Sequence, residues 1–275
     1  MVNLATKFAP KVDEKITIDS YTGKNLNTDY EFAGVETVKI YSIDTVDLND
    51  YTRSGTSRYG TPEELGDSVQ EMKVTQDKAF TYTIDKGNDA QQLNVKGAAA
   101  SLKRQIAEKV IPMLDKYRFA KFVENVQEGM SDATAISKTT AYEKFLDGTS
   151  KLAAKGFSEG LVSYWTPAAY NKIKLDSSFV KSGDLSQKML QKGQVGEIDG
   201  VKVIVVAGDR MPEGVDFIIT HNKAMVSPMV LREYKIHRDP PGINGNLVEG
   251  RILFDAFILG SRKNAIYVQG ETVGA

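Results

Sequence analysis

The feature that most constrains this fold is a long polar stretch between two strand-like segments. Residues 50–70 read DYTRSGTSRYGTPEELGDSVQ, and little apolar surface is present beyond Tyr51, Tyr59, Leu65 and Val69. Loops of this length are uncommon inside compact domains and are usually functional or disordered. The stretch cannot build a core of its own, so we expect its contacts to lie on another surface.

The segments on either side of this stretch predict a long β-hairpin. Residues 35–48 are rich in β-branched side chains, and residues 69–86 place Met72 and four later apolar residues in one phase. Each side can extend about 45–60 Å at roughly 3.3 Å per residue. An isolated two-stranded ribbon is marginal in water, so the hairpin should lie on something else. The sequence TPEELG at 61–66 predicts one capped helical turn at the tip.

The next segment predicts one very long amphipathic helix. Through residues 89–126, apolar side chains recur every three or four positions. A helix of this extent would be about 57 Å long at 1.5 Å per residue. Pro112 is expected to kink it or to mark a junction, because proline lacks a backbone N–H and clashes with the preceding turn.

The remaining sequence alternates short helices and short strands, which favours an α+β fold. Residues 139–156 are expected to form one helix or a broken pair of helices. Further expected features are a buried Trp165, a helix capped by Thr166, a helix at 184–193, a tight turn at Asp199-Gly200, two long strands joined by DPPGINGN, and a last strand at 264–269.

Composition excludes several classes of chemistry. With 35 basic and 36 acidic residues the net charge is −1, which argues against a dedicated nucleic-acid binder. Cysteine is absent, and the two histidines, His221 and His237, lack the spacing of metal ligands. No catalytic motif is present, so we expect neither enzymatic activity nor a cofactor. The N-terminus does not read as a signal peptide and no apolar run is long enough to span a membrane, so we expect synthesis and folding in the cytoplasm.

The order of these parts resembles the major capsid protein of tailed bacteriophages, which has the Hong Kong 97 fold. The resemblance covers nearly the whole chain and includes LVSYWTPAAYNKIK, VGEIDGVKVIVV and LVEGRILFDAFILGSRKNAIYV. It implies an N-terminal arm at 1–34, an extended loop at 35–88, a peripheral domain with the spine helix at 89–132 and 223–261, and an axial domain at 133–222 and 262–275.

The resemblance also implies a function. It predicts a structural protein of the virion that is assembled in the host cytoplasm, with pentamers and hexamers of one chain forming an icosahedral shell around a dsDNA genome. Separate scaffolding, portal and decoration proteins and non-specific contact with packaged DNA are expected partners. In this family the extended loop lies over an adjacent subunit, so the predicted intersubunit contacts are Tyr51, Arg53, Arg58, Tyr59, Leu65 and Met72.

Two alternatives remain open at the level of sequence. An encapsulin-like compartment shell shares the fold but encloses enzyme cargo rather than a genome. A soluble α+β domain that binds or hydrolyses a small ligand would instead be a monomer. The nature of the enclosed material separates the first alternative from a phage shell, and the oligomeric state separates the second.

Overall fold

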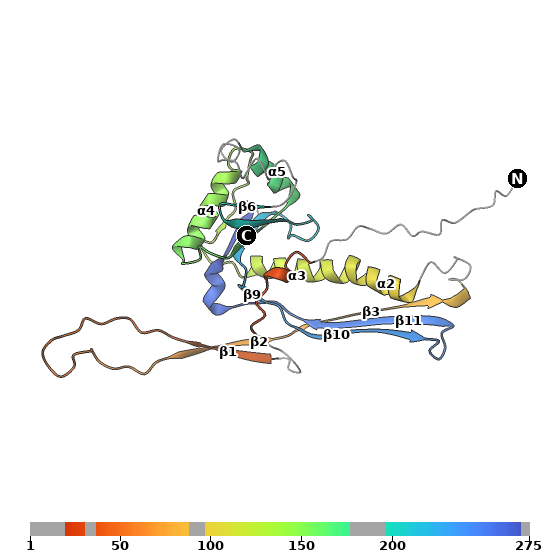
Figure 1. Ribbon diagram of the computed structural model, residues 1–275, viewed down its shortest axis with the longest axis horizontal. Helices are drawn as coiled ribbons and strands as arrows, with labels where there is room; N and C mark the ends of the chain where they lie inside the picture. Colours follow the sequence, from red (N-terminus) through yellow and green to blue (C-terminus); the bar gives the residue numbers. More distant parts are fainter. Residues whose placement is uncertain (1–19, 31–36, 88–96, 177–195, 271–275) are drawn as a thin grey trace.

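The computed structural model describes residues 20–30, 37–87, 97–176 and 196–270. Figure 1 shows three parts: a region of helices packed on a sheet, a long helix lying along a second sheet, and a hairpin whose loop projects away from both. The fold mixes helices and strands, as the sequence predicts.

The predicted long helix is present as one continuous rod. It begins with α2 (Ala98–Gln105), passes through a π-helical turn (Ile106–Val110) and ends with α3 (Ile111–Glu124). The predicted junction at Pro112 is therefore a π-helical turn within a continuous helix, and the helix is not interrupted there. Pro112 is the second residue of α3 and follows the π-helical segment, in which the hydrogen bonds span five residues instead of four. The described part of the rod begins at residue 98, so its predicted first turns lie outside the described residues.

A three-stranded antiparallel sheet lies against one side of this helix. Its strands, in the order β10-β11-β3, are β10 (Met229–Arg238), β11 (Gly245–Phe254) and β3 (Gln76–Asp85). Val110 and Leu114 of the helix pack on Ile252 and Phe254 of β11. The sheet therefore buries its apolar face under the helix and leaves the other face to solvent.

The predicted hairpin is shorter than expected and its second side is divided. Strands β1 (Thr37–Ile43) and β2 (Asp67–Lys73) pair antiparallel over their whole length. The sequence predicts that residues 69–86 continue as one side of the hairpin, but the chain leaves it after Lys73. The Thr75 N–H and hydroxyl both donate to Asp255 Oδ2, at 2.9 and 2.8 Å, and β3 then joins the other sheet. The predicted helical turn at 61–66 is wrong, since this segment is neither helix nor strand.

The third part is a six-stranded sheet with helices packed on it. The strands, in sheet order, are β4 (Ser131–Asp132), β13 (Ile266–Gly270), β8 (Val215–His221), β5 (Leu161–Trp165), β7 (Val201–Val205) and β6 (Glu197–Ile198). Two helices accompany them, α4 (Ala141–Ala154) and α5 (Pro167–Leu175). Trp165 is fully buried as predicted, and its ring stacks on Phe217 with centroids 4.3 Å apart.

Several predicted turns and caps are confirmed. The Thr166 hydroxyl accepts from the Ala169 N–H and starts α5. Asp199 and Gly200 both have positive φ, as a two-residue hairpin turn requires. The predicted helix at 184–193 lies outside the described residues. Short elements join the parts: two 3₁₀ turns (Gly23–Asn25 and Gly260–Ala265) and the paired strands β9 (Met225–Val226) and β12 (Phe257–Ile258).

Two aromatic rings lie so close to Gly250 that we expect any larger residue at this position to destabilise the fold. Gly250 stands opposite both Phe80 and Tyr234, and an added Cβ would meet the Phe80 ring at 2.4 Å. We expect Gly250→Val to lower the free energy of unfolding by about 1–3 kcal/mol, because both rings must move. Chemical denaturation measures this change. The matched control is Gly208→Val at a position with open space, and an equal loss in both variants would contradict the argument.

An ion pair beside the six-stranded sheet predicts a dependence of stability on pH. Lys144 Nζ of α4 lies 2.9 Å from Asp132 Oδ2 of β4. Burial raises the pKa of Asp132, but the hydrogen bonds from Lys144 and Thr134 outweigh it and lower that pKa from 3.8 to about 2. A depressed folded-state pKa stabilises the fold above the unfolded value, and this contribution is lost as pH falls from about 4 to 2.

We expect Asp132→Asn to cost about 1 kcal/mol at pH 6 and markedly less at pH 2.5. Thermal unfolding at the two pH values measures the difference. A loss of stability that is the same at both would show that the Asp132 carboxylate charge contributes nothing.

Candidate assembly surfaces

The loop that joins β1 to β2 is almost wholly exposed. Every residue from 41 to 69 except Gly60 is exposed to solvent. Among the described residues, all exposed large hydrophobic side chains except Leu175 and Ile236 lie in this segment, and they are Tyr41, Ile43, Val46, Leu48, Tyr51, Tyr59, Leu65 and Val69. Apolar side chains gathered on one exposed element mark an interaction surface. From here on, the extended loop means residues 44–66, the part of the predicted 35–88 segment that joins β1 to β2.

The far end of the extended loop brings together three of the residues predicted from sequence. The rings of Tyr51 and Tyr59 meet edge to face with centroids 5.1 Å apart. Arg58 donates from Nε to the Gly55 carbonyl at 3.2 Å, and its own carbonyl accepts from the Thr52 N–H at 3.1 Å. These contacts are all local, so they shape the tip while its outer surface stays open.

The other two predicted loop residues are exposed but stand apart from this pair of rings. Arg53 is exposed at the turn of the tip. Leu65 lies on the returning side, where it lines a hollow together with Val46 and several carboxylates. The structure describes a single subunit, so contact of these side chains with a neighbouring copy stays a prediction.

Met72 corrects the sequence prediction. Its side chain is fully buried and packs in its own subunit against Val226 and Leu259. The reason is strand alternation, since the face of the hairpin that carries Met72 and Val38 turns inward at the base. Met72 therefore anchors the hairpin to its own chain and offers no surface to a neighbour.

Gln70 completes this anchor. Its Nε2 donates to the Ile258 carbonyl at 2.8 Å, and its Oε1 accepts from the Gly260 N–H at 2.8 Å. Gln70 lies on the same face of β2 as Met72, and its side chain satisfies the backbone groups of Ile258 and Gly260. The opposite face of the hairpin carries the exposed Tyr41 and Val69, which stand directly across from each other.

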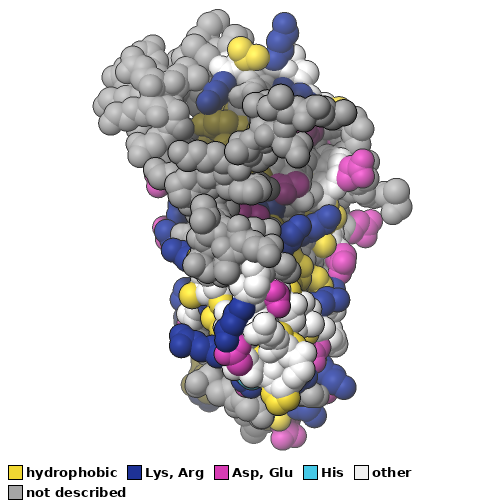
Figure 2. All heavy atoms as spheres, turned by 90° about the vertical axis from the view of Figure 1, so that its right-hand side faces the viewer, with side chains coloured by type: hydrophobic (Ala, Val, Ile, Leu, Met, Phe, Trp, Pro, Cys, Tyr) yellow, Lys and Arg dark blue, Asp and Glu magenta, His cyan; other side chains and the backbone are white. Residues whose placement is uncertain are grey.

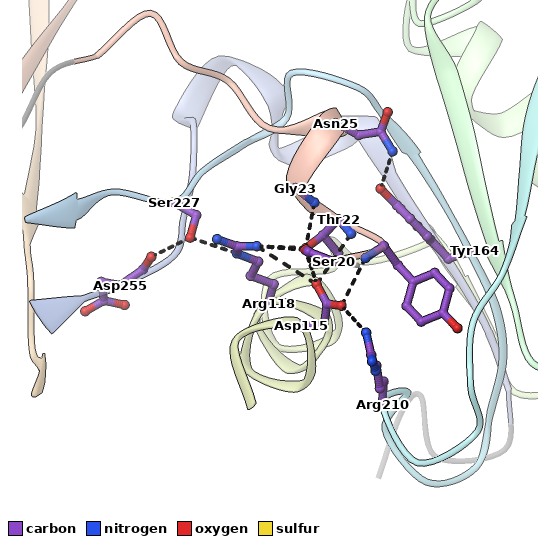
Figure 3. Close-up of polar contacts among 11 residues, drawn as sticks. Ser20, Thr22, Gly23, Asn25, Asp115, Arg118, Tyr164, Arg210, Ser227 and Asp255 are labelled. Atoms are coloured by element: carbon purple, nitrogen blue, oxygen red, sulfur yellow. Dashed lines mark hydrogen bonds and ion pairs between the residues drawn. The ribbon is translucent and has the colours of Figure 1, made fainter. Parts of the chain in front are cut away.

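A second candidate surface is the place where the N-terminal segment lies on the long helix (Figure 3). The Asp115 carboxylate, fully buried in α3, accepts from the Ser20 hydroxyl at 2.6 Å, the Tyr21 N–H at 3.0 Å and the Thr22 hydroxyl at 2.7 Å. The guanidinium of Arg210, from the loop before β8, reaches the same carboxylate at 2.8 Å. One side chain therefore ties the arm, the helix and the six-stranded region together.

Arg118, one turn further along α3, extends this network. Its Nη1 donates to the Thr22 hydroxyl at 3.0 Å and its Nε to the Ser227 hydroxyl at 2.9 Å. Burial lowers the pKa of Arg118, and the nearby Asp115 carboxylate opposes that effect. Ser227 in turn donates to the Asp255 carbonyl at 2.9 Å, which carries the connection to the three-stranded sheet.

The two histidines lie on different strands and do not come together. His237 pairs with Glu249 at 3.1 Å on the exposed sheet face, and His221 lies on another strand, where burial lowers its pKa. In the ranges that the structure describes, no group of side chains is arranged to hold a metal ion. Nor does any described helix combine the length and apolar character of a membrane span.

Charges of both signs are spread over the sheet end of the molecule. Figure 2 views the molecule from that end, and Lys, Arg, Asp and Glu side chains are interspersed on the described part of the face. This mixture agrees with the net charge of −1.

Comparison with solved structures assigns the fold. A structure from Mycobacterium phage Che8 matches with a TM-score of 0.78 and 17% identity over 98% of both chains. The asymmetric unit of the bacteriophage PhiM1 mature capsid matches with a TM-score of 0.73 and 11% identity, over 98% of this chain and 92% of the other. The capsid structure of the cyanophage P-SCSP1u matches with a TM-score of 0.75 and 10% identity, over 98% and 93%.

The chain therefore has the fold of phage capsid proteins over almost its entire length. No model of a known protein family matches its sequence. No curated protein matches either. The fold is thus shared at identities of 17% and below, where side-chain patterns diverge while the arrangement of elements persists.

The buried network around Asp115 predicts a large effect of removing the carboxylate. We expect Asp115→Ala to cost about 3–5 kcal/mol of unfolding free energy, because it breaks the buried pairs of this carboxylate with Arg118 and Arg210. Urea denaturation measures the loss, and limited proteolysis near residue 20 reports release of the arm. The control Asp29→Ala removes an exposed pair with Lys223 and should cost at most about 1 kcal/mol. Equal effects would contradict the assigned role.

Proposed function

We propose that this protein is the major capsid protein of a tailed phage, which self-assembles into the icosahedral shell that encloses a dsDNA genome. The observation that carries the proposal is the extended loop, an exposed apolar element with no core in its own subunit. The shared fold supports the same interpretation, since two of the matched structures are phage capsids.

The proposed role of each part follows from its contacts. The extended loop lies over an adjacent copy, and the anchored base of the hairpin holds it in a fixed direction. The helix and three-stranded sheet serve as the peripheral domain, and the six-stranded region serves as the axial domain around which pentamers and hexamers close.

Burial of the apolar side chains of the loop against another copy would favour assembly. At about 25 cal/mol per Å², an interface that covers 1,000 Å² of apolar surface contributes on the order of 25 kcal/mol before ordering and association costs are subtracted. Each copy in a closed shell both gives and receives such a contact. Modest net affinity per contact therefore yields a stable particle.

The proposal includes partners and a location. The shell is part of the virion and is assembled in the host cytoplasm, with separate scaffolding, portal and decoration proteins and non-specific contact with the packaged DNA. The protein acts as a structural component rather than as an enzyme and needs no cofactor. The encapsulin-like shell and the soluble hydrolytic or ligand-binding domain are not favoured, because the matched structures come from phages.

Truncating the exposed side chains of the loop tests the proposal. We expect the triple variant Tyr51→Ser, Tyr59→Ser, Leu65→Ser to lose particle formation, because each truncation removes about 1–3 kcal/mol of burial from every interface. The stability of the isolated subunit should change by no more than about 0.5 kcal/mol, because the three side chains are exposed. Electron microscopy and analytical ultracentrifugation measure assembly, and thermal unfolding measures stability.

The matched control replaces polar side chains of the same tip. Ser54→Ala together with Thr56→Ala should leave particle yield unchanged. A wild-type protein that stays monomeric at high concentration would overturn the proposed function. Normal particles from the triple variant would overturn the role of the loop.

A further inference from the structure

The loop that joins β10 to β11 carries the single Asn-Gly pair of the sequence, Asn244-Gly245. Figure 1 shows this loop at the end of the three-stranded sheet that points away from the six-stranded region. Asn244 is exposed, and Gly245 begins β11. A backbone nitrogen that follows an asparagine can attack the side-chain amide of that asparagine, and in glycine no Cβ obstructs the attack. The pair is therefore a candidate for spontaneous deamidation.

The attacking nitrogen, that of Gly245, is not held by the sheet. In an antiparallel pair, residues that exchange hydrogen bonds alternate with residues that do not. The Lys86 N–H donates to the Asn244 carbonyl at 3.0 Å, so the Gly245 N–H points away from β3 and toward the β10 side. There the Asp239 N–H donates to the Gly245 carbonyl at 2.7 Å, but among the described residues no bond returns from the Gly245 N–H to Asp239. Asp239 has a positive φ of 47°, which turns the chain out of the ladder at this point.

The hydrogen bond from Lys86 also favours the reaction. The nitrogen of Gly245 becomes a nucleophile when it loses its proton, and the negative charge that results is shared with the Asn244 carbonyl oxygen. A hydrogen bond to the charged form of a group makes that form easier to reach. The bond from the Lys86 N–H reaches this oxygen and therefore eases deprotonation of the Asn244–Gly245 peptide group.

We propose that Asn244 is a site of spontaneous deamidation in the folded protein. The Gly245 nitrogen bonds to Cγ of Asn244 while the bond from Cγ to the side-chain nitrogen breaks, and the displaced proton leaves with that nitrogen as ammonia. One water then opens the cyclic imide at either carbonyl, which gives an aspartate or an isoaspartate. Water is the only co-reactant, and each conversion adds one negative charge to the loop. The inference does not depend on the proposed function.

The isoaspartate product changes the local structure as well as the charge. It lengthens the main chain by one carbon at position 244, directly before the first pair of β11 with β3, which is Gly245 opposite Asp85. The backbone is tightly packed there, since a Cβ added to Gly245 would meet the Ile84 carbonyl oxygen at 2.1 Å. An extra backbone atom therefore breaks the hydrogen bond from Lys86 and opens this end of the sheet.

Peptide mass spectrometry of aged protein tests the site. Folded full-length protein is incubated at mildly alkaline pH, and trypsin then releases residues 239–251, which contain both Asn244 and the matched internal control Asn246. We expect at least about ten times more deamidation at Asn244, because the Cβ of Leu247 obstructs the attack at Asn246. Leu247 is also paired with strands on both sides. Equal amounts at the two positions, or product at Asn244 only in urea-unfolded protein, would overturn the inference.

A pair of substitutions assigns the new charge to this residue. Anion-exchange chromatography of aged wild-type protein should show a more acidic species that increases with time. Asn244→Gln should remove this species, because the longer side chain must close a larger and less favourable ring, while the matched control Asn246→Gln should keep it. Growth of the same species at the wild-type rate in Asn244→Gln contradicts the assignment.

Hydrogen exchange tests the structural consequence. We expect the Lys86 amide to exchange at least about tenfold faster in the isoaspartate fraction than in fresh protein, because the end of the sheet opens locally. The Ile252 amide, further along β11, should exchange at the same rate in both. An unchanged rate at Lys86, or an equal rise at both amides, would show that no local opening follows. These measurements need only folded protein, so a failure of the proposed shell leaves them interpretable.

Discussion

The buried carboxylate of Asp115 is the interaction on which the arrangement of this subunit depends. A charge taken out of water is costly unless it is paired and hydrogen-bonded, and here two guanidinium groups and the N-terminal segment supply those partners. The partners are residues 20–22, Arg118 on the same helix and Arg210 in the loop before β8, so the carboxylate is fully satisfied only when these stretches of chain are in place. The helix, the arm and both sheets are thereby fixed relative to one another.

The hairpin is fixed to its own subunit at its base, while the loop at its other end stays exposed to solvent. At its base, Met72 is buried in the subunit and Gln70 bonds two backbone groups, so the direction of the ribbon is set. Beyond Tyr41 the side chains face solvent. A loop held this way loses less conformational freedom on docking than an unanchored one, which raises the affinity of every contact.

Much of the fold was predictable from sequence because it depends on local patterns. Periodicity indicated the long helix, and the residues at Thr166 and Asp199-Gly200 marked a cap and a turn. The division of residues 69–86 between two sheets was not predictable, because it depends on Asp255, which lies far away in the sequence. The same limit applies to Met72, whose burial depends on Val226 and Leu259, and to Asp115, which looks like any surface acid on a helix.

The carboxylates of the extended loop have a consequence for the free subunit. In the proposed shell, newly made chains accumulate before enough copies exist to cover their exposed tyrosines, leucines and valines. Acidic side chains interspersed among such residues oppose indiscriminate clumping, since like charges repel at each chance encounter. Neutralising them would therefore shorten the time for which the protein stays dispersed, even where the finished particle tolerates the change.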